Sequence, residues 1–204
     1  MATTAGDVLL ACLADQLDEL RRHDPGVRAN QPDSIHQMRV ASRRIRSLLA
    51  TGRSLFDDGA AEDVRAGLRW LSRALGAARD PVVVHGRLTD LLASEPQGLV
   101  DGLAAERITE ELEADAAAGF EGALAALAGE RYTRLLAGLK ELAAAPSLSD
   151  KAARPPRRMI RKLVAKDEAR LRRAVEALPA HGGSGAGGAD ARDLGLHDVR
   201  KAAK

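Results

Sequence analysis

The stretch "SIHQMRVASRRIRSLL", residues 34–49, predicts one helix with an apolar face beside a basic face. At about 100° per residue, Met38, Ile45 and Leu49 fall on a core-facing stripe. The neighbouring arc of roughly 100° carries five basic residues: His36, Arg39, Arg43, Arg46 and Arg53. An apolar stripe of this kind must be covered by other helices, so the stretch favours a helical bundle.

The rest of the chain shows the same helical periodicity and no sustained strand alternation. Its bias toward Ala, Leu, Arg and Glu favours helices. The sequence HDPG, residues 23–26, is expected to end the first helix, and Asp80 and Pro81 are typical of a helix start. We therefore expect an all-α fold, with helices at residues 6–22, 34–56, 60–78 and 80–92, one or two helices in 99–145, and a last long helix at 155–178.

Length and composition bound the class of protein. The 204 residues suffice for a single large domain, and a net charge of +2 identifies no partner by itself. The single cysteine, Cys12, excludes an internal disulfide and is expected to be buried among its apolar neighbours. No apolar run approaches the ~20 residues that cross a bilayer, and the first residues do not form a secretory signal. We expect a cytoplasmic protein with no membrane partner.

The basic face contains like-charge neighbours. Arg39 lies one turn from Arg43, and Arg43 lies one turn from Arg46, with no carboxylate in residues 34–46. Each such pair destabilises a helix by about 0.2–0.5 kcal/mol. Either carboxylates of other helices or an external anion must meet this face, and guanidinium groups suit phosphate oxygens. Arg44 falls on the far flank of the helix, away from the face.

A second copy of the pattern lies near the end of the chain. HQMRVASR, residues 36–43, aligns with HDVRKAAK, residues 197–204, so that His197, Arg200 and Lys204 correspond to the first histidine and two basic residues. Two such helices facing each other would form a cationic channel. The Gly-rich residues 179–195 before this copy are expected to be a flexible loop.

Three motifs in this order resemble the CHAD family, the conserved histidine α-helical domain: HQMRVASRRIR (36–46), RWLSRALGAARDPVVV (69–84) and LHDVRKAAK (196–204). The resemblance covers nearly the whole chain and implies one domain, residues 1–204. It also implies two pseudo-symmetric bundles of long antiparallel helices around a basic central pore that binds inorganic polyphosphate. The two halves would be about 1–95 and 99–204.

Carried over by motif position, the resemblance implies ligand-facing roles for eight residues: His36, Arg39, Arg43, Arg46, His197, Arg200, Lys201 and Lys204. Arg44 also matches the family pattern. Arg79 and Asp80 match a further motif, in which we expect Arg79 to reach the pore and Asp80 to cap a helix. The family's second motif runs on through more basic residues, so we expect the natural domain to continue past Lys204.

The predicted function is non-catalytic binding of inorganic polyphosphate, or of another phosphate-rich anion, with no metal and no cofactor. Affinity would come largely from counterion release and would fall with salt. Arg158, Arg161 and Lys162 on the 155–178 helix would extend the positive field, although Asp167 and Glu168 favour a solvated basic face there. A role in targeting to polyphosphate granules is compatible with this binding.

Two other function classes fit less well. A phosphate-processing enzyme, or an accessory domain acting on polyphosphate, normally needs a metal held by carboxylates or a positioned base, and the acidic residues 99–130 show no such pairing. Single-stranded nucleic acid usually stacks on aromatic side chains, and the four aromatic residues mostly lie in apolar contexts. A duplex could not enter a narrow pore. Phosphate release with Mg²⁺, and competition between DNA and polyphosphate, would discriminate these classes.

Overall fold

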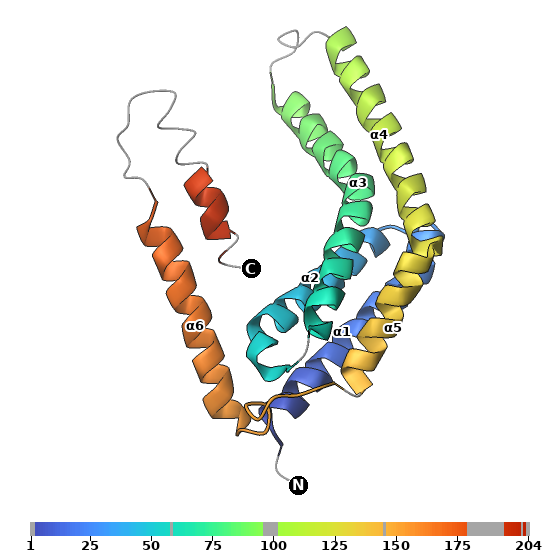
Figure 1. Cartoon of the computed structure of the whole chain (residues 1–204). Coiled ribbons are helices and arrows are strands. Elements are labelled where there is room, and N and C mark those ends of the chain that lie inside the picture. The colour runs from blue at the N-terminus through green and yellow to red at the C-terminus, as the bar shows by residue number, and fades with distance from the viewer. Residues whose placement is uncertain are drawn as a thin grey trace. The chain divides into compact units, whose positions relative to one another are not determined.

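The computed structural model describes residues 3–57, 59–95, 102–144, 146–178, 194–200 and 202. Within these ranges the chain is helical, with no strand beyond one isolated bridge, which confirms the all-α prediction. No described helix is both long enough and apolar enough to span a membrane. The elements are α1 (Ala5–Arg28), α2 (Ser34–Thr51), the 3₁₀ helix η1 (Gly52–Leu55), α3 (Ala60–Ser94), α4 (Gly102–Ala128), α5 (Glu130–Ala144) and α6 (Pro156–Glu176) (Figure 1).

The chain divides into two compact units that are each assembled from distant segments. The bundle unit comprises Leu10–Leu49 and Asp58–Pro146, and the terminal unit comprises Met1–Leu9, Ala50–Asp57 and Ser147–Lys204. Each unit combines segments that are distant in the sequence, so the units do not coincide with the two predicted sequence halves. The pseudo-symmetry and the central pore stay predictions.

The core of the bundle unit follows the predicted helical stripes. On α3, Leu68, Leu71 and Leu75 recur at i+3 and i+4 and are fully buried, as is the stripe of α2. The helix α3 runs along α4 and also contacts α5 (Figure 1). The largest fully buried apolar side chains of this unit are Leu13, Leu20, Val27, Met38, Ile45, Leu49, Leu68, Leu71, Leu75 and Leu139.

The position of Cys12 corrects one prediction. Leu13, Leu17 and Leu20 form the buried stripe of α1, and Cys12 falls about 100° away from Leu13 around the helix. Its side chain is therefore exposed rather than buried.

Two helix ends predicted from proline are wrong. The helix α1 continues through Pro25 to Arg28, and α3 continues through Pro81 to Ser94. A proline inside a helix removes one hydrogen bond and crowds the preceding turn. Burial beyond the proline offsets this penalty, since Val27 is fully buried and α3 packs along α4. Asp80 is consequently an interior helix residue, and it does not cap a new helix.

The end of α2 also differs from the prediction of a helix over 34–56. The α-helix ends at Thr51, and Gly52–Leu55 tighten into η1. Gly52 lies so close to Leu9 that an added Cβ would be 2.8 Å from its Cδ2 atom, so the chain tightens at a residue without a side chain. A 3₁₀ helix has fewer residues per turn than an α-helix, so the α-helical spacing that placed Arg53 on the basic face does not apply to it.

The terminal unit is held together by contacts between its three segments. The Ala5 N–H donates to the Arg154 carbonyl at 2.9 Å, and the Thr51 hydroxyl donates to Asp167 on α6 at 2.8 Å. Residues 194–200 are helical, whereas the loop was predicted to extend to residue 195. The remainder of that predicted loop, residues 179–193, lies outside the described residues.

Candidate anion-binding site

The basic face of α2 is directed toward α3 inside the bundle unit. Arg39 reaches across to α3, where its Nη1 atom lies 2.5 Å from the Oδ1 atom of Asp80. Its guanidinium group also lies over Gly76, where an added Cβ would be 3.7 Å from Nη1. Of the other two arginines on this face, Arg46 is half-buried and Arg43 is exposed.

The helix α3 carries a second row of arginines. Arg65, Arg69 and Arg73 recur every fourth residue and therefore follow one another along the helix. Burial, together with the guanidinium groups of these three residues, lowers the pKa of Arg46 from its ordinary value. Arg46 still keeps its charge at neutral pH. We call the combined set the α2–α3 arginine face: Arg39, Arg43, Arg46, Arg65, Arg69 and Arg73.

Carboxylates neutralise this face only in part. Glu62 accepts from Arg65 at 2.5 Å and from Arg69 at 3.2 Å, and Asp80 accepts from Arg39. Among the described residues, no carboxylate pairs with Arg43, Arg46 or Arg73. The buried Nε of Arg65 likewise finds no acceptor within the described part of the chain. The face therefore keeps a large positive charge and unused N–H donors.

The α3 row was missed in the sequence, although a signal was present. Arg65, Arg69 and Arg73 have i, i+4 spacing, and the buried leucines of α3 repeat beside them. Each arginine alone resembles an ordinary surface residue. Only the approach of α2 shows that the two rows share one field.

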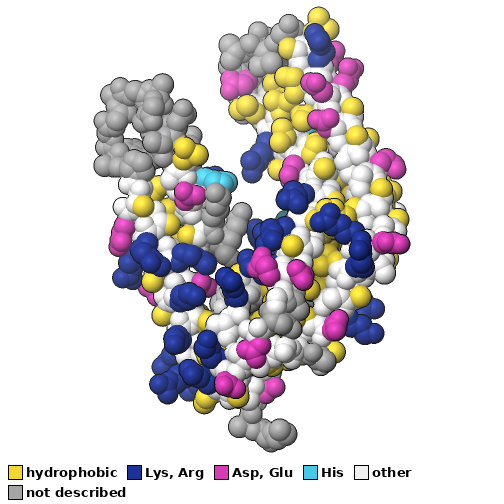
Figure 2. All heavy atoms as spheres, viewed as in Figure 1, with side chains coloured by type: hydrophobic (Ala, Val, Ile, Leu, Met, Phe, Trp, Pro, Cys, Tyr) yellow, Lys and Arg dark blue, Asp and Glu magenta, His cyan; other side chains and the backbone are white. Residues whose placement is uncertain are grey.

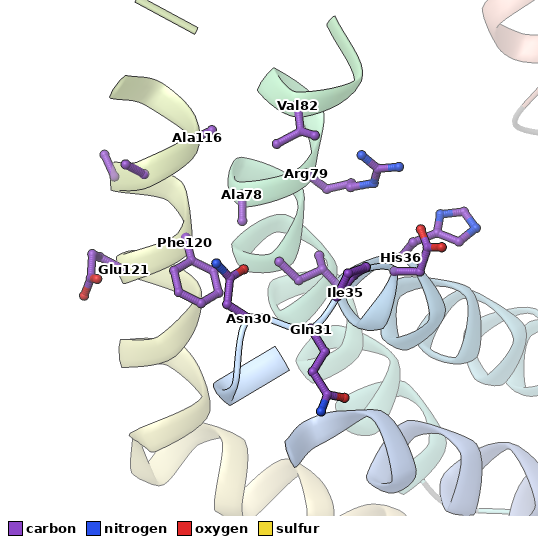
Figure 3. A pocket seen from close by; sticks show the side chains of 14 residues that line it. Asn30, Gln31, Ile35, His36, Ala78, Arg79, Val82, Ala116, Phe120 and Glu121 are labelled. Carbon is purple, nitrogen blue, oxygen red and sulfur yellow. The ribbon is translucent and has the colours of Figure 1, made fainter. Parts of the chain in front are cut away.

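Two other predicted residues, His36 and Arg79, come together at the start of α2. Both line a cavity of about 730 Å³ in the bundle unit. Their side chains project toward the same side in Figure 3. None of the six residues of the α2–α3 arginine face lines this cavity. The cavity nevertheless adjoins the face, because His36 lies one turn from Arg39 and Arg79 directly precedes Asp80, the partner of Arg39.

The remaining predicted residues are placed as follows. Arg44 is exposed on α2, and Arg53 is exposed in η1, which belongs to the terminal unit. His197 and Arg200 are exposed on the last described helix of the terminal unit. Lys201 and Lys204 lie outside the described residues. The facing of the two motif copies stays a prediction.

The predicted extension on α6 is a fully exposed basic surface. Arg158, Arg161 and Lys162 are all exposed, and Figure 2 shows Lys and Arg side chains gathered over α6. Acidic partners occur only farther along the helix, where Asp167 and Glu168 lie. No described carboxylate pairs with the three predicted residues.

The chain matches the model of the CHAD domain family over residues 11–204. The uncharacterized protein MT2285 of Mycobacterium tuberculosis (strain CDC 1551 / Oshkosh) is 34% identical over 202 residues, which cover 97% of this chain and 37% of that protein. The uncharacterized protein Rv2226 of strain H37Rv matches to the same extent. The chain therefore spans a little over a third of the length of these relatives.

Solved structures share the fold. PptA from Streptomyces chartreusis superposes with a TM-score of 0.80 at 25% identity, covering 98% of this chain and 72% of PptA. The CHAD domain from the plant Ricinus communis superposes with a TM-score of 0.64 at 23% identity, covering 98% of this chain and 65% of that chain, which shows the fold alone. These matches confirm the resemblance found in the three sequence motifs: the chain belongs to the CHAD domain family.

Proposed function

We propose that this chain is a non-catalytic module that binds inorganic polyphosphate, or another chain of phosphates, through the α2–α3 arginine face. The observation that carries the proposal is that Arg46 of α2 lies near Arg65, Arg69 and Arg73 of α3, while Glu62 and Asp80 are the only described carboxylates that pair with the face. A linear polyanion would relieve the resulting like-charge repulsion.

The geometry of two helical rows suits a repeating anion. Residues four apart on an α-helix are separated by about 6 Å along its axis, so each row offers guanidinium groups at regular intervals. Arginine binds phosphate oxygens through paired N–H groups, and each charged hydrogen bond contributes about 1.5–3 kcal/mol. Release of counterions from the phosphate chain would add to the affinity.

Membership of the CHAD family supports this proposal, because the sequence resemblance to that family implies polyphosphate as the ligand. The proposal includes the parts of the prediction that go further: a pore completed by His197 and Arg200, a cytoplasmic location and an association with polyphosphate granules. Any activity of the longer relatives beyond the matched third is outside the proposal.

The test is a titration of the whole chain with polyphosphate of one defined length. We expect Arg43→Ala/Arg46→Ala to weaken binding roughly a hundredfold, because two charged contacts worth about 3 kcal/mol together are lost. The logarithm of the affinity should also depend less steeply on the logarithm of the salt concentration. The matched control is Arg158→Ala/Arg161→Ala on α6, which removes the same charge and should weaken binding less than about threefold.

Equal losses in the two double variants would overturn the assignment of the α2–α3 arginine face. Release of phosphate from the bound chain in the presence of Mg²⁺ would instead support the enzymatic alternative. Displacement of polyphosphate by DNA at a lower concentration of phosphate groups would support nucleic-acid binding.

A further inference from the structure

The cavity at the start of α2 has a shape and chemistry that a phosphate chain alone does not use. It lies where the loop before α2, the middle of α3 and the middle of α4 meet, and its volume is about 730 Å³ (Figure 3). This is within the range of small-molecule sites, roughly 300–1,000 Å³. The cavity adjoins the Arg39 end of the α2–α3 arginine face, but none of the six arginines lines it.

Small residues keep this cavity open. Gly119 brings the backbones of α4 and α3 together, since an added Cβ would be only 2.2 Å from the Ala77 carbonyl oxygen. The next residue on α4, Phe120, is thereby held against the cavity beside Ala78 of α3. Alanines occupy the neighbouring lining positions, residues 116–118, so no large side chain fills the space.

One side of the cavity carries the donors His36 and Arg79, and the carboxylate of Asp33 belongs to the same lining. His36 and Arg79 project toward the same side from α2 and α3 (Figure 3). Arg79 has no carboxylate partner among the described residues. The backbone N–H groups of Ile35 and His36, in the first turn of α2, have no backbone acceptor in the described part of the chain. Such groups at a helix start favour a phosphate.

The rest of the lining includes apolar side chains and an aromatic ring. Phe120 lies apart from His36 and Arg79, whereas Ile35 and Val82 lie beside them, and Val82 is 47% exposed (Figure 3). Asn30 lines the cavity beside the ring in Figure 3, and its amide can both donate and accept hydrogen bonds. Glu121 also belongs to the lining, but its carboxylate points away from the ring in the same view. A planar heterocycle fits this combination.

We infer that this cavity binds a nucleoside phosphate, with the base packed on Phe120 and the phosphates held by His36 and Arg79. Asn30 would hydrogen-bond to the edge of the base. The ligand class follows from the cationic and aromatic lining residues together, because inorganic polyphosphate has no apolar part to place against the ring. The inference does not depend on the function proposed for the α2–α3 arginine face.

The experiment compares ATP with inorganic tripolyphosphate, which shares its triphosphate but lacks the nucleoside, by calorimetry on the whole chain. We expect ATP to bind at least about tenfold more tightly. Phe120→Ala should remove roughly that tenfold advantage and leave the affinity for tripolyphosphate unchanged, because stacking on an aromatic ring is lost.

A second variant keeps the test decisive if Phe120→Ala fails to fold. Arg79→Gln removes a half-exposed charge and should weaken ATP binding about tenfold. Its matched control is Arg87→Gln, an exposed arginine on the same helix outside the cavity, which should leave ATP binding unchanged. Circular dichroism of each variant reports the helical content.

Equal affinities for ATP and tripolyphosphate, with no effect of Phe120→Ala or Arg79→Gln, would overturn the inference. Loss of ATP binding only in Arg43→Ala/Arg46→Ala would also overturn it, because ATP would then bind through its phosphates on the arginine face. In that case the polyphosphate proposal would stand. If Arg43→Ala/Arg46→Ala binds polyphosphate normally but the ATP results are as expected, the cavity assignment stands and the proposed function fails.

Discussion

The α2–α3 arginine face and helix α6 carry similar numbers of positive charges in very different settings. On α6 the basic side chains are all exposed, and Met159 is the buried residue recorded for the helix. Arg170 pairs with Asp167 at 3.4 Å and Arg172 with Glu168 at 2.9 Å, each within one turn. In the bundle unit, by contrast, Arg46 is half-buried and faces arginines of another helix.

The difference shows that convergence, more than the number of basic residues, distinguishes the stronger anion site. Charges on a single exposed helix are screened by water and salt, so each contributes little. On the α2–α3 arginine face, Arg46 and Arg65 are partly removed from water, although Arg43 and Arg73 are exposed, so the repulsion around Arg46 persists until an anion arrives. This reasoning ranks the α2–α3 arginine face above α6.

The largest expected effect comes from the row that the sequence reasoning missed. We expect Arg69→Ala/Arg73→Ala on α3 to weaken polyphosphate binding roughly a hundredfold, as much as the α2 double variant, because both rows face the same ligand. Arg170→Ala/Arg172→Ala on α6 is the matched control and should change the affinity less than about threefold. Titration at one fixed salt concentration measures both.

A strong loss confined to the α6 variant would reverse the comparison. A strong loss in both variants would show that the two basic surfaces contribute equally to one binding event.

Local pattern predicted the helices and one row of the site, but not how the rows meet. The spacing of Met38, Ile45 and Leu49 was enough to orient α2, because a buried stripe must face a core. The contact of Arg39 with Asp80 depends on how α2 crosses α3, which no periodicity encodes. Pro81 misled the prediction for the same reason, since packing of α3 along α4 overrides its local preference.

A medium effect is expected where α4 supports α3. Gly119→Ala places a Cβ 2.2 Å from the Ala77 carbonyl, so the backbones must separate, and we expect the free energy of unfolding to fall by about 1–3 kcal/mol. Gly122→Ala on the same helix meets nothing within 4 Å and should raise stability by up to about 1 kcal/mol. Urea unfolding measures both.

Equal stability of the two glycine variants would mean that α3 is not held by this contact. The convergence of its arginines with α2 would then need a different structural support, and the contrast with the exposed α6 would weaken.

The smallest effects should come from the carboxylates within each basic surface. Glu62→Gln leaves Arg65 and Arg69 without their acidic partner, so polyphosphate should bind about threefold more tightly, since a local repulsion of less than about 1 kcal/mol is removed. Glu168→Gln, which removes the partner of Arg172 on α6, should leave the affinity unchanged. Tighter binding of both variants to the same degree would erase the distinction between the two surfaces.

The charge of Glu62 should make the stability of the fold depend on pH. Burial acts to raise the pKa of Glu62, but the hydrogen bond from Arg69 and the charge of Arg65 lower it below its ordinary value of 4.5. Its ionised form therefore stabilises the fold above about pH 4.5, and this contribution is lost as the pH falls through the lowered pKa. Wild type should exceed Glu62→Gln in unfolding free energy by no more than about 1 kcal/mol at pH 7, because the Glu62 carboxylate is exposed, and by nothing in strong acid. A difference that persists in strong acid would show that Glu62 acts through packing rather than through its charge on the arginine face.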